Sequence, residues 1–562
     1  MRRGTLVILL CGVMLAHGGH AFMQAEEFKI SITPLKAFFL PNEMAIFSIT
    51  TNGGQSVRVV ITHLADVVDT FDVDLFHTTL SWQPPAIAPR GYGITVTLLD
   101  KQGTVLATSS TAFDVLDNWI QAPRYGFLSQ FEAGRSNIEE TMEWNARFHV
   151  NGLQFYDWQY RHESLVPPEE NYSDLLGRQM SLSTVCQLIE AAHAHQIAAM
   201  PYTAIYGASV AFYQAHPEWA LFQRAGIPYE FGDNFLMIMD PSPDSSWTDH
   251  LMSEFGRVLD SLPFDGIHLD QYGAPKTGYN YNENRVDLAE AIPGFINRTV
   301  DVVRQKRGDS GAVIFNAVGN WPVDTVALSE QDAVYVEVWA PYRDFLDLHR
   351  IIAGAENLGG GKPVIIAAYI HPERLFNVQL ANAVIFASGG YHLELGEPGA
   401  MLADPYFPKF GQMDEVLQEI TQNYYDFSVR YEEVLSLDTT NAPQRAEALT
   451  TEGVETNKVR AKDQVAVIAR SGQGFDTFSL INFMGVSTNR WETPLDKAPD
   501  SLINLPIHIQ TEQPVLRVWW ASPDHASLLN AQPVSFSAEI DGITLTLPGL
   551  DYWTMIVVEY QQ

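Results

Sequence analysis

Cysteine is almost absent from this chain of 562 residues, which contains only Cys11 and Cys186. Cys11 falls within an apolar N-terminal segment that we expect to be removed, so Cys186 alone stays in the mature chain. A single cysteine cannot form an internal disulfide. The fold must therefore be held by hydrophobic cores, and a content of 46% hydrophobic and 11% aromatic residues is sufficient to build them.

Basic residues are also few in this chain. Lys and Arg number 34 against 67 Asp and Glu, which gives a formal net charge of -33 at pH 7. Nucleic acid and anionic membranes bind basic surfaces, so neither is an expected partner. A neutral polymer such as a glucan makes no such demand. The acidity by itself indicates no more than solubility outside a cell.

Motifs for metals and nucleotides are missing as well. The chain contains no CxxC, no HExxH and no EF-hand loop, so we expect no metal and no cofactor. No GxGxxG or GxxxxGK(S/T) opens a predicted helix, which argues against nucleotide binding. After the N-terminal segment, no run of residues has the length and apolar character of a membrane span.

Residues 1–25 have the pattern of a secretory signal peptide. Arg2 and Arg3 form a basic start, and the apolar run from Thr5 to Ala16 is short for a membrane span. Small residues between positions 19 and 25 offer several cleavage points. We therefore predict a secreted protein, extracellular or periplasmic, that acts as a monomer.

Three regions follow, and each has its own hydrophobic pattern. Residues 26–117 alternate apolar and polar positions between turn signals such as Asn52-Gly53-Gly54, which predicts an immunoglobulin-like β-sandwich. Residues 118–428 alternate short apolar runs with helical stretches, which predicts β/α units. Residues 429–562 return to β alternation and are expected to form a C-terminal β-sandwich, an all-β domain.

The middle region contains eight apolar runs that are typical of strands. Helical stretches such as Asn284 to Lys306 lie between them. Eight alternations over about 300 residues favour a closed (β/α)8 TIM barrel over an open doubly wound sheet, and such barrels place their sites at the carboxyl ends of the strands. The predicted strands are residues 124–129, 152–158, 197–204, 264–270, 312–318, 333–339, 364–370 and 391–396.

Two of these runs carry a carboxylate near the carboxyl end, where a buried strand should be apolar. Asp270 ends the fourth run, and Glu337 lies near the end of the sixth. Because strand side chains alternate between two faces, Asp270 shares a face with His268, and Glu337 shares a face with Trp339. Two carboxylates facing one sugar-sized space are what glycoside hydrolysis requires. Asp265 lies at the opposite end of its run and is not counted as a catalyst.

Other polar and aromatic side chains end the neighbouring runs and would converge on the same barrel mouth. Each alone has a plainer explanation, as a packed ring, a satisfied internal hydrogen bond or a structural ion pair. Their convergence on one face favours substrate binding. The predicted substrate-binding residues are Asp157, Trp158, His162, Tyr206, His268, Asn316, Trp339, Tyr369, His392 and Glu394.

These segments together resemble glycoside hydrolase family 66, the dextranases and cycloisomaltooligosaccharide glucanotransferases. Any one motif is moderately specific, but the set occurs in the same order over the whole barrel, between two β regions. The segments are Phe264 to Gly273, Val334 to Trp339, Tyr125 to Leu128, Gln154 to Trp158 with Arg161 and His162, Tyr206 to Ala208, and His392 to Glu397.

The resemblance implies a mechanism and a substrate. Asp270 would be the nucleophile and Glu337 the general acid/base of a retaining double displacement on α-1,6-glucosidic bonds within dextran. Trp158 would stack on the sugar at the cleavage subsite. The partners would be dextran and isomaltooligosaccharides. A separation of about 5–5.5 Å between the carboxyl groups would agree with retention, and about 6.5–9.5 Å with inversion.

The choice between hydrolysis and cyclisation depends on one departure from the resemblance. Cyclising members carry a carbohydrate-binding module inserted late in the barrel, and the connection from Tyr369 to Tyr391 has no room for one. We therefore predict a secreted, endo-acting dextranase. The alternatives are a cyclodextran-forming glucanotransferase, a catalytically silent glucan-binding protein, and a glycosidase for another α-linked glucan.

Overall fold

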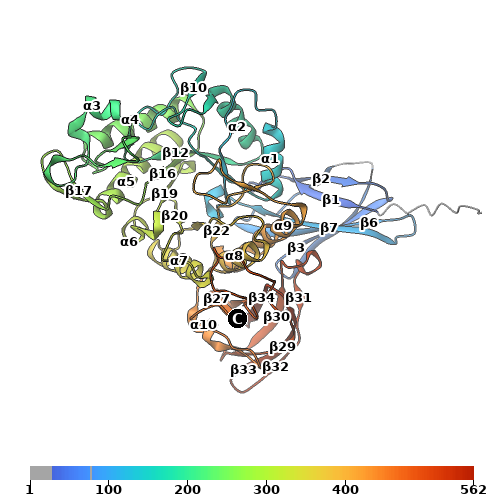
Figure 1. The fold of residues 1–562 in the computed structure, drawn as a ribbon. Helices are drawn as coiled ribbons and strands as arrows, with labels where there is room; N and C mark the ends of the chain where they lie inside the picture. Colours follow the sequence, from blue (N-terminus) through green and yellow to red (C-terminus); the bar gives the residue numbers. More distant parts are fainter. Residues whose placement is uncertain (1–27, 76–78, 458, 562) are drawn as a thin grey trace, which may run out of the picture.

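The computed structural model describes residues 28–75, 79–457 and 459–561. The expected signal peptide, residues 1–25, lies outside the described residues. Three parts follow one another along the chain: two antiparallel sheets, a parallel eight-stranded barrel covered by helices, and two further antiparallel sheets (Figure 1). A multidomain fold built around a barrel is thus confirmed.

The N-terminal part consists of two antiparallel sheets around one hydrophobic core. One contains β1 (Ile30–Pro34), β2 (Ala45–Thr51) and β5 (Thr79–Trp82), and the other β3 (Ser56–His63), β4 (Asp66–Asp74), β6 (Arg90–Leu99) and β7 (Val105–Val115). Burial alternates along β2, which suits a strand with one face in a core. Phe47 of the first sheet packs edge-on against Phe113 of the second, with ring centroids 5.1 Å apart. The immunoglobulin-like class of this part stays a prediction.

The barrel strands lie in the sheet in the same order as in the chain. They are β8 (Tyr125–Leu128), β9 (Gly152–Phe155), β12 (Ala198–Ala204), β16 (Gly266–Asp270), β19 (Ala312–Asn316), β20 (Ala333–Glu337), β21 (Val364–Ala367) and β22 (Tyr391–His392). The segment after β22 meets the first strand, where the Phe127 N–H donates to Leu395 O at 2.9 Å. A closed (β/α)8 barrel was predicted, and the structure has eight parallel strands in a nearly closed barrel.

Side chains of the barrel strands alternate between two hydrophobic clusters. Ile267 and Leu269 of β16 and Val336 of β20 belong to the outer cluster, which lies between strands and helices. Tyr335 belongs to the inner cluster. His268 also lies inside, where its ring meets that of Tyr335 edge-on with centroids 5.2 Å apart. The predicted faces of the fourth and sixth strands are therefore confirmed.

Helices cover the outside of the barrel (Figure 1). None of those in the described ranges is long and apolar enough to cross a bilayer. The predicted start of one helix was wrong, since α5 begins at Leu288 rather than at Asn284. Residues 285–287 instead pair with the strand before them, and Asp287 caps the helix. The helices are α1 (Ile138–Arg147), α2 (Leu182–Ala194), α4 (Ser246–Ser261), α5 (Leu288–Arg307), α6 (Val323–Val326), α7 (Phe345–Leu358), α8 (Leu375–Ala387) and α9 (Glu415–Arg430).

Short hairpins enlarge the loops at the carboxyl ends of the strands. Two of these loops, after β12 and after β16, lie side by side and project from the barrel. The added elements are β10 (Asn171–Ser173), β11 (Gln179–Ser181), β13 (Gly207–Ala208), α3 (Val210–Ala215), β14 (Glu230–Phe231), β15 (Leu236–Ile238), β17 (Thr277–Tyr279), β18 (Arg285–Asp287), β23 (Ala400–Met401) and β24 (Gly411–Gln412).

The C-terminal part again has two antiparallel sheets around a core. It is not purely β, because α10 (Pro443–Ala448) packs beside its first strands. One sheet contains β25 (Thr439–Asn441), β27 (Val465–Gly472), β28 (Phe475–Asn482), β34 (Trp553–Tyr560), β30 (Val515–Ala521) and β31 (Gln532–Pro533), and the other contains β26 (Leu449–Thr451), β29 (Leu502–Gln510), β33 (Gly542–Leu550) and β32 (Phe536–Ala538).

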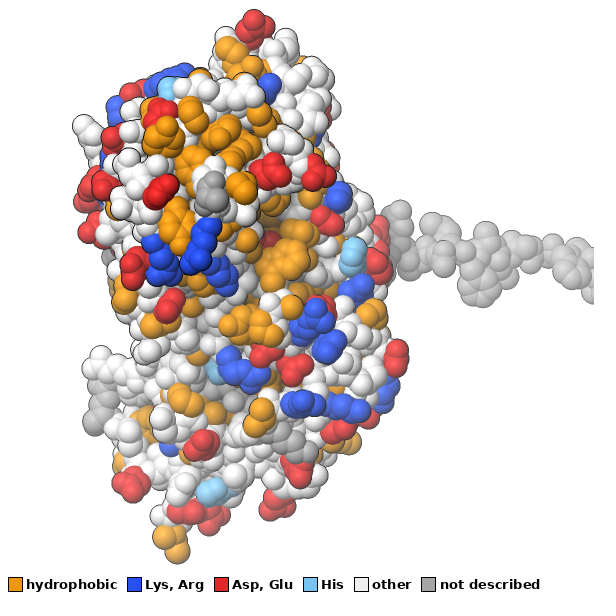
Figure 2. Space-filling view, turned by 60° about the vertical axis from the view of Figure 1, so that its left-hand side comes forward, with side chains coloured by type: hydrophobic (Ala, Val, Ile, Leu, Met, Phe, Trp, Pro, Cys, Tyr) orange, Lys and Arg blue, Asp and Glu red, His pale blue; other side chains and the backbone are white. Residues whose placement is uncertain are grey.

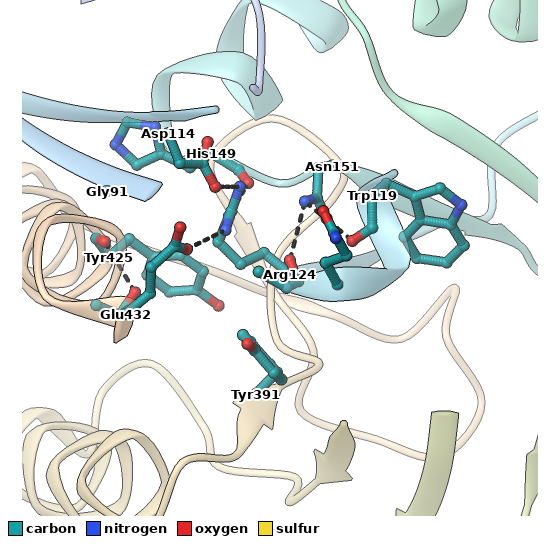
Figure 3. A network of polar contacts seen from close by, with 12 residues as sticks. Gly91, Asp114, Trp119, Arg124, His149, Asn151, Tyr391, Tyr425 and Glu432 are labelled. Atoms are coloured by element: carbon teal, nitrogen blue, oxygen red, sulfur yellow. Dashed lines mark hydrogen bonds and ion pairs between the residues drawn. The ribbon is translucent and has the colours of Figure 1, made fainter. Parts of the chain in front are cut away.

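A buried arginine joins the parts at the amino ends of the barrel strands (Figure 3). Arg124, directly before β8, places Nη2 2.7 Å from Asp114 Oδ2 of β7 and Nη1 3.4 Å from Glu432 Oε2, two residues beyond α9. Its Nε donates to His149 O at 2.6 Å. Each of the three charged side chains is at most 3% exposed. Burial and the neighbouring Asp114 raise the pKa of Glu432 well above its ordinary value, and Arg124 opposes that shift.

Helix α9 contacts all three parts of the molecule. Asp426 accepts hydrogen bonds from the Thr111 hydroxyl at 2.8 Å and from His149 Nε2 at 2.7 Å, which ties the N-terminal sheets to the barrel. On the C-terminal side, the Tyr424 hydroxyl donates to Asp524 Oδ1 at 2.8 Å, and Phe427 packs on Trp553. The helix is therefore a shared support for the barrel and both sets of antiparallel sheets.

Candidate active site

Three adjacent strands bring two carboxylates and an amide together at the mouth of the barrel. Asp270 ends β16, Asn316 ends β19 and Glu337 ends β20, and β19 lies between the other two. Asn316 Nδ2 donates to Asp270 Oδ1 at 2.8 Å and to Glu337 Oε2 at 3.1 Å. These two oxygens are thus no more than about 6 Å apart, which is the sum of the two distances.

A tyrosine completes the hydrogen bonding of each carboxylate. The Tyr202 hydroxyl, from β12, donates to Asp270 Oδ2 at 2.8 Å. The Tyr369 hydroxyl, which follows β21, donates to Glu337 Oε1 at 2.7 Å. No cationic side chain is hydrogen-bonded to either carboxylate among the described residues. The pair is therefore held in place entirely by neutral donors.

Burial raises the pKa of both carboxyl groups. For Asp270 the pKa rises to about 7, because burial and the charge of Glu337 together outweigh the hydrogen bonds that favour its ionised form. Burial likewise raises the pKa of Glu337, against the hydrogen bonds from Tyr369 and Asn316. Two close carboxyl groups without a cation do not ionise together easily, so near neutral pH the pair retains a proton.

The carboxylates lie in a cleft of about 370 Å³. Rings form much of its wall, and Trp339 keeps 43% of its surface exposed there. Asp157 also lines the cleft: burial raises its pKa to about 6 against the nearby positive charge of Arg178. Aromatic faces with a few convergent polar groups suit a sugar, whose rings have apolar faces and hydroxyl edges. The rings at the wall are Tyr156, Tyr160, Tyr202, Phe231, Phe235, Tyr272, Trp339 and Tyr406.

Half of the predicted substrate-binding residues lie at this cleft. Asp157, His162 and Trp339 line it, and Asn316 and Tyr369 donate hydrogen bonds to the carboxylates. Burial lowers the pKa of His162 to about 4, so its imidazole is neutral and presents one donor and one acceptor. These five side chains are in position to contact a bound sugar or to position the groups that do.

The other five predicted residues do not reach the cleft wall. Trp158 is fully buried against Phe264, so its ring is not available to stack on a sugar. His268 lies deeper in the barrel, where burial lowers its pKa to about 3. The others are Tyr206, which accepts from the Tyr272 N–H, and His392 and Glu394, which are both hydrogen-bonded to Asn382.

Several cleft residues are not among the ten predicted substrate-binding residues. Tyr202 lies inside β12, two residues before the strand finishes. Phe231 and Tyr406 come from loop elements far from the strand ends in sequence. For Tyr202 the alternation of β12 was a usable signal, because it places that side chain on the inner face with His268.

A parallel barrel with two carboxylates facing one cleft at the carboxyl ends of its strands is typical of glycoside hydrolases. The model of glycosyl hydrolase family 66 matches residues 35–557 of this chain. The chain therefore belongs to glycosyl hydrolase family 66, as its motifs indicated, and is a glycoside hydrolase.

Curated relatives carry two different activities. A cycloisomaltooligosaccharide glucanotransferase of Niallia circulans is 23% identical over 672 residues, covering 90% of this chain and 68% of the relative. A dextranase of Streptococcus salivarius is 24% identical over 563 residues, covering 84% of this chain and 67% of the relative. Both activities thus occur among proteins of similar distance from this chain.

Solved structures show the same fold. A cycloisomaltooligosaccharide glucanotransferase of Paenibacillus, in complex with cycloisomaltoheptaose, has a TM-score of 0.85 at 20% identity, covering 94% of this chain and all of that one. A maltogenic α-amylase of Thermotoga neapolitana is more distant, with a TM-score of 0.50 at 10% identity over 79% of this chain. Similarity in the first case extends beyond the barrel to the antiparallel sheets.

Proposed function

We propose that this protein is an endo-acting dextranase that cleaves α-1,6-glucosidic bonds with retention of configuration. The observation that carries the proposal is the amide of Asn316, which holds Oδ1 of Asp270 and Oε2 of Glu337 no more than about 6 Å apart. Inverting enzymes need about 6.5–9.5 Å between the carboxyl groups, because a water molecule must fit. The substrate class comes from the family and from the names of its members.

In the first step, Asp270 attacks the anomeric carbon and forms a glycosyl ester. Glu337 gives its proton to the glycosidic oxygen, so the bond to the leaving sugar breaks as the bond to Asp270 forms. The raised pKa of Glu337 supports this role, because an ordinary glutamic acid would already be ionised at neutral pH. The hydrogen bonds from Tyr202 and Asn316 favour the ionised form of Asp270, which is the attacking form.

In the second step, the ionised Glu337 removes a proton from water, and the resulting hydroxide attacks the anomeric carbon. The ester bond breaks, Asp270 leaves as a carboxylate, and Glu337 is protonated again. The pKa of about 7 for Asp270 reflects its burial first and the charge of Glu337 beside it second. The pair needs one proton in total, on Glu337, so activity requires a pH between the two ionisations of the pair.

The short connection between the last two barrel strands favours hydrolysis over cyclisation. Only α8 lies between β21 and β22, and no further domain is inserted there. A transferase uses the same ester but delivers it to a sugar hydroxyl, so the acceptor decides the outcome. We also propose that the enzyme is a monomer and that it acts outside the cell. The pattern of residues 1–25 supports the extracellular location.

The test is the product pattern from dextran. The wild type should give shortened linear isomaltooligosaccharides whose new ends are first released as the α-anomer, seen by proton NMR. Asp270→Asn should lose at least about 1,000-fold in rate, while Asp265→Asn, an acid at the other end of the same strand, should stay active. Cyclic products would instead support the transferase. Initial release of the β-anomer would exclude retention. If dextran is not cleaved, the proposed substrate is wrong.

A further inference from the structure

A second aromatic pocket lies outside the catalytic cleft, on the two projecting loops after β12 and β16. Its main side chains are Phe222, Arg224, Tyr279, Asn280, Tyr281 and Glu283. Figure 2 faces this side of the molecule, where hydrophobic side chains gather over the upper part. None of these six side chains belongs to the catalytic cleft.

The pocket is a built part of the fold, because the two loops are joined through their backbones. The Phe222 N–H donates to Tyr279 O at 2.7 Å, and the Tyr279 N–H donates to Phe222 O at 2.9 Å. Gly278 allows this approach, since a Cβ there would lie 2.6 Å from the Leu221 side chain. The tip beyond Tyr279 is closed by Asn280, whose side chain accepts from the backbone of residues 282 and 284. The rings are thus held on a fixed support.

Folding does not account for the most exposed of these rings. Tyr281 keeps 58% of its surface exposed, although the hairpin is already closed by backbone hydrogen bonds. Its ring inclines toward that of Phe222, with centroids 6.1 Å apart and an interplanar angle of 57°. Arg224, Asn280 and Glu283 add donors and acceptors beside these rings. Exposed rings next to hydrogen-bonding groups are the means by which proteins bind sugars.

The same loops also form a wall of the catalytic cleft, which connects the two sites. Phe231 and Tyr272, one from each loop, line the cleft and stack with centroids 4.5 Å apart. Backbone bridges run from there to the outer pocket, since Phe222 pairs both with Pro228 and with Tyr279. The outer pocket and this wall of the cleft are therefore built from the same pair of loops.

We propose that this outer pocket is a second glucan-binding site, which holds a distant part of the α-1,6-glucan chain while another part is cleaved. The inference rests on the proposed function for the identity of the sugar. A neutral polymer suits the site, because the pocket has one acid and one base and the chain as a whole is strongly acidic. The site would favour long substrates over short ones and would leave the chemistry unchanged.

The test compares Tyr281→Ala with the wild type on long dextran and on the shortest isomaltooligosaccharide that the wild type cleaves. We expect KM for dextran to rise about three- to tenfold at unchanged kcat, because one aromatic contact strengthens binding by about that factor. Both constants for the short substrate should stay as they are. Tyr281→Phe should behave as wild type, and so should Ile540→Ala, an exposed apolar residue of the C-terminal part.

A binding measurement separates this inference from the proposed function. Retardation in a gel containing dextran should be smaller for Asp270→Asn/Tyr281→Ala than for Asp270→Asn alone. If Tyr281→Ala changes neither this retardation nor the preference for long substrate, the second site is excluded. If the wild type cleaves neither substrate but is retarded by dextran through Tyr281, the proposed function fails and the binding site stands.

Discussion

The barrel has a pair of close carboxylates at each end, and the two pairs have different partners. At the mouth, the neutral amide of Asn316 bridges Asp270 and Glu337. At the base, the cation of Arg124 bridges Asp114 and Glu432. A neutral bridge leaves a proton on the pair, and that proton can be transferred. A cationic bridge compensates a negative charge permanently and holds its partners in one place.

The comparison shows that burial alone does not make a catalytic acid. Burial raises the pKa of Glu337 and of Glu432 alike. Only the first faces a cleft, where a substrate can take the proton. The second is enclosed by three segments that are far apart in sequence (Figure 3). The bridging side chain and the access to substrate, rather than the pKa, distinguish the catalytic carboxyl group from the structural one.

The same substitution in each pair gives the largest contrast. Glu337→Gln should reduce kcat on dextran by about 1,000-fold, because the acid/base group is lost, and should leave the melting temperature nearly unchanged. Glu432→Gln should keep kcat and alter only stability. Steady-state kinetics and thermal unfolding of both variants check this, and equal losses of kcat would contradict the division between the two pairs.

Removal of each bridge should have opposite effects. Arg124→Met leaves Asp114 and Glu432 buried without a cation, which should cost about 3–5 kcal/mol of unfolding free energy. The folded fraction should still cleave dextran normally. Asn316→Leu should instead lower kcat and cost far less stability. Urea unfolding and activity per folded molecule are the measurements, and a stable Arg124→Met protein would show that the base network does not support the fold.

The two tyrosines at the mouth should act on different limbs of the pH profile. Tyr369→Phe removes a hydrogen bond that favours ionised Glu337, so the pKa of that acid rises and the alkaline limb of kcat moves to higher pH. Tyr202→Phe acts in the same way on Asp270 and should move the acid limb up. Movement of the same limb in both variants would refute the assignment of nucleophile and acid.

The smallest expected effect is a change in how stability depends on pH. The pKa of Glu432 is raised in the folded state above its ordinary value of 4.5. Its contribution to stability is therefore present below about pH 4.5 and is lost as pH rises through the folded pKa. Glu432→Gln has no such loss, so its stability relative to the wild type should increase between pH 4.5 and 8. A constant difference in urea unfolding would contradict the shifted pKa.

Local alternation was enough to predict the fold of the barrel and the two carboxylates. Ile267 and Leu269 face the helices, which leaves His268 and Asp270 on the inner face without any long-range information. The position of a residue along its strand then places it at one end of the barrel. Both steps depend only on the period of two residues in a strand.

What the sequence could not predict depends on backbone turns and on contacts between distant segments. Asp157 has a φ of 52°, which ends the strand early and puts the next ring, Trp158, into the core instead of the cleft. The side chains of His392 and Glu394 are both hydrogen-bonded to Asn382 of α8. The ion pair between Arg124 and Glu432 joins residues 308 positions apart. None of these outcomes follows from a local pattern.

Helix α9 limits how this protein can be taken apart. It is hydrogen-bonded to the N-terminal sheets through Asp426 and to the C-terminal part through Tyr424, so neither region is an accessory attached by a linker. A recombinant barrel cut out at residues 118–428 would keep most of α9 and would expose the helix side chains, such as Tyr424 and Asp426, that the flanking parts now contact. Exchange of domains between family members should therefore give a folded protein only when α9 is transferred together with the N-terminal and C-terminal sheets that it contacts.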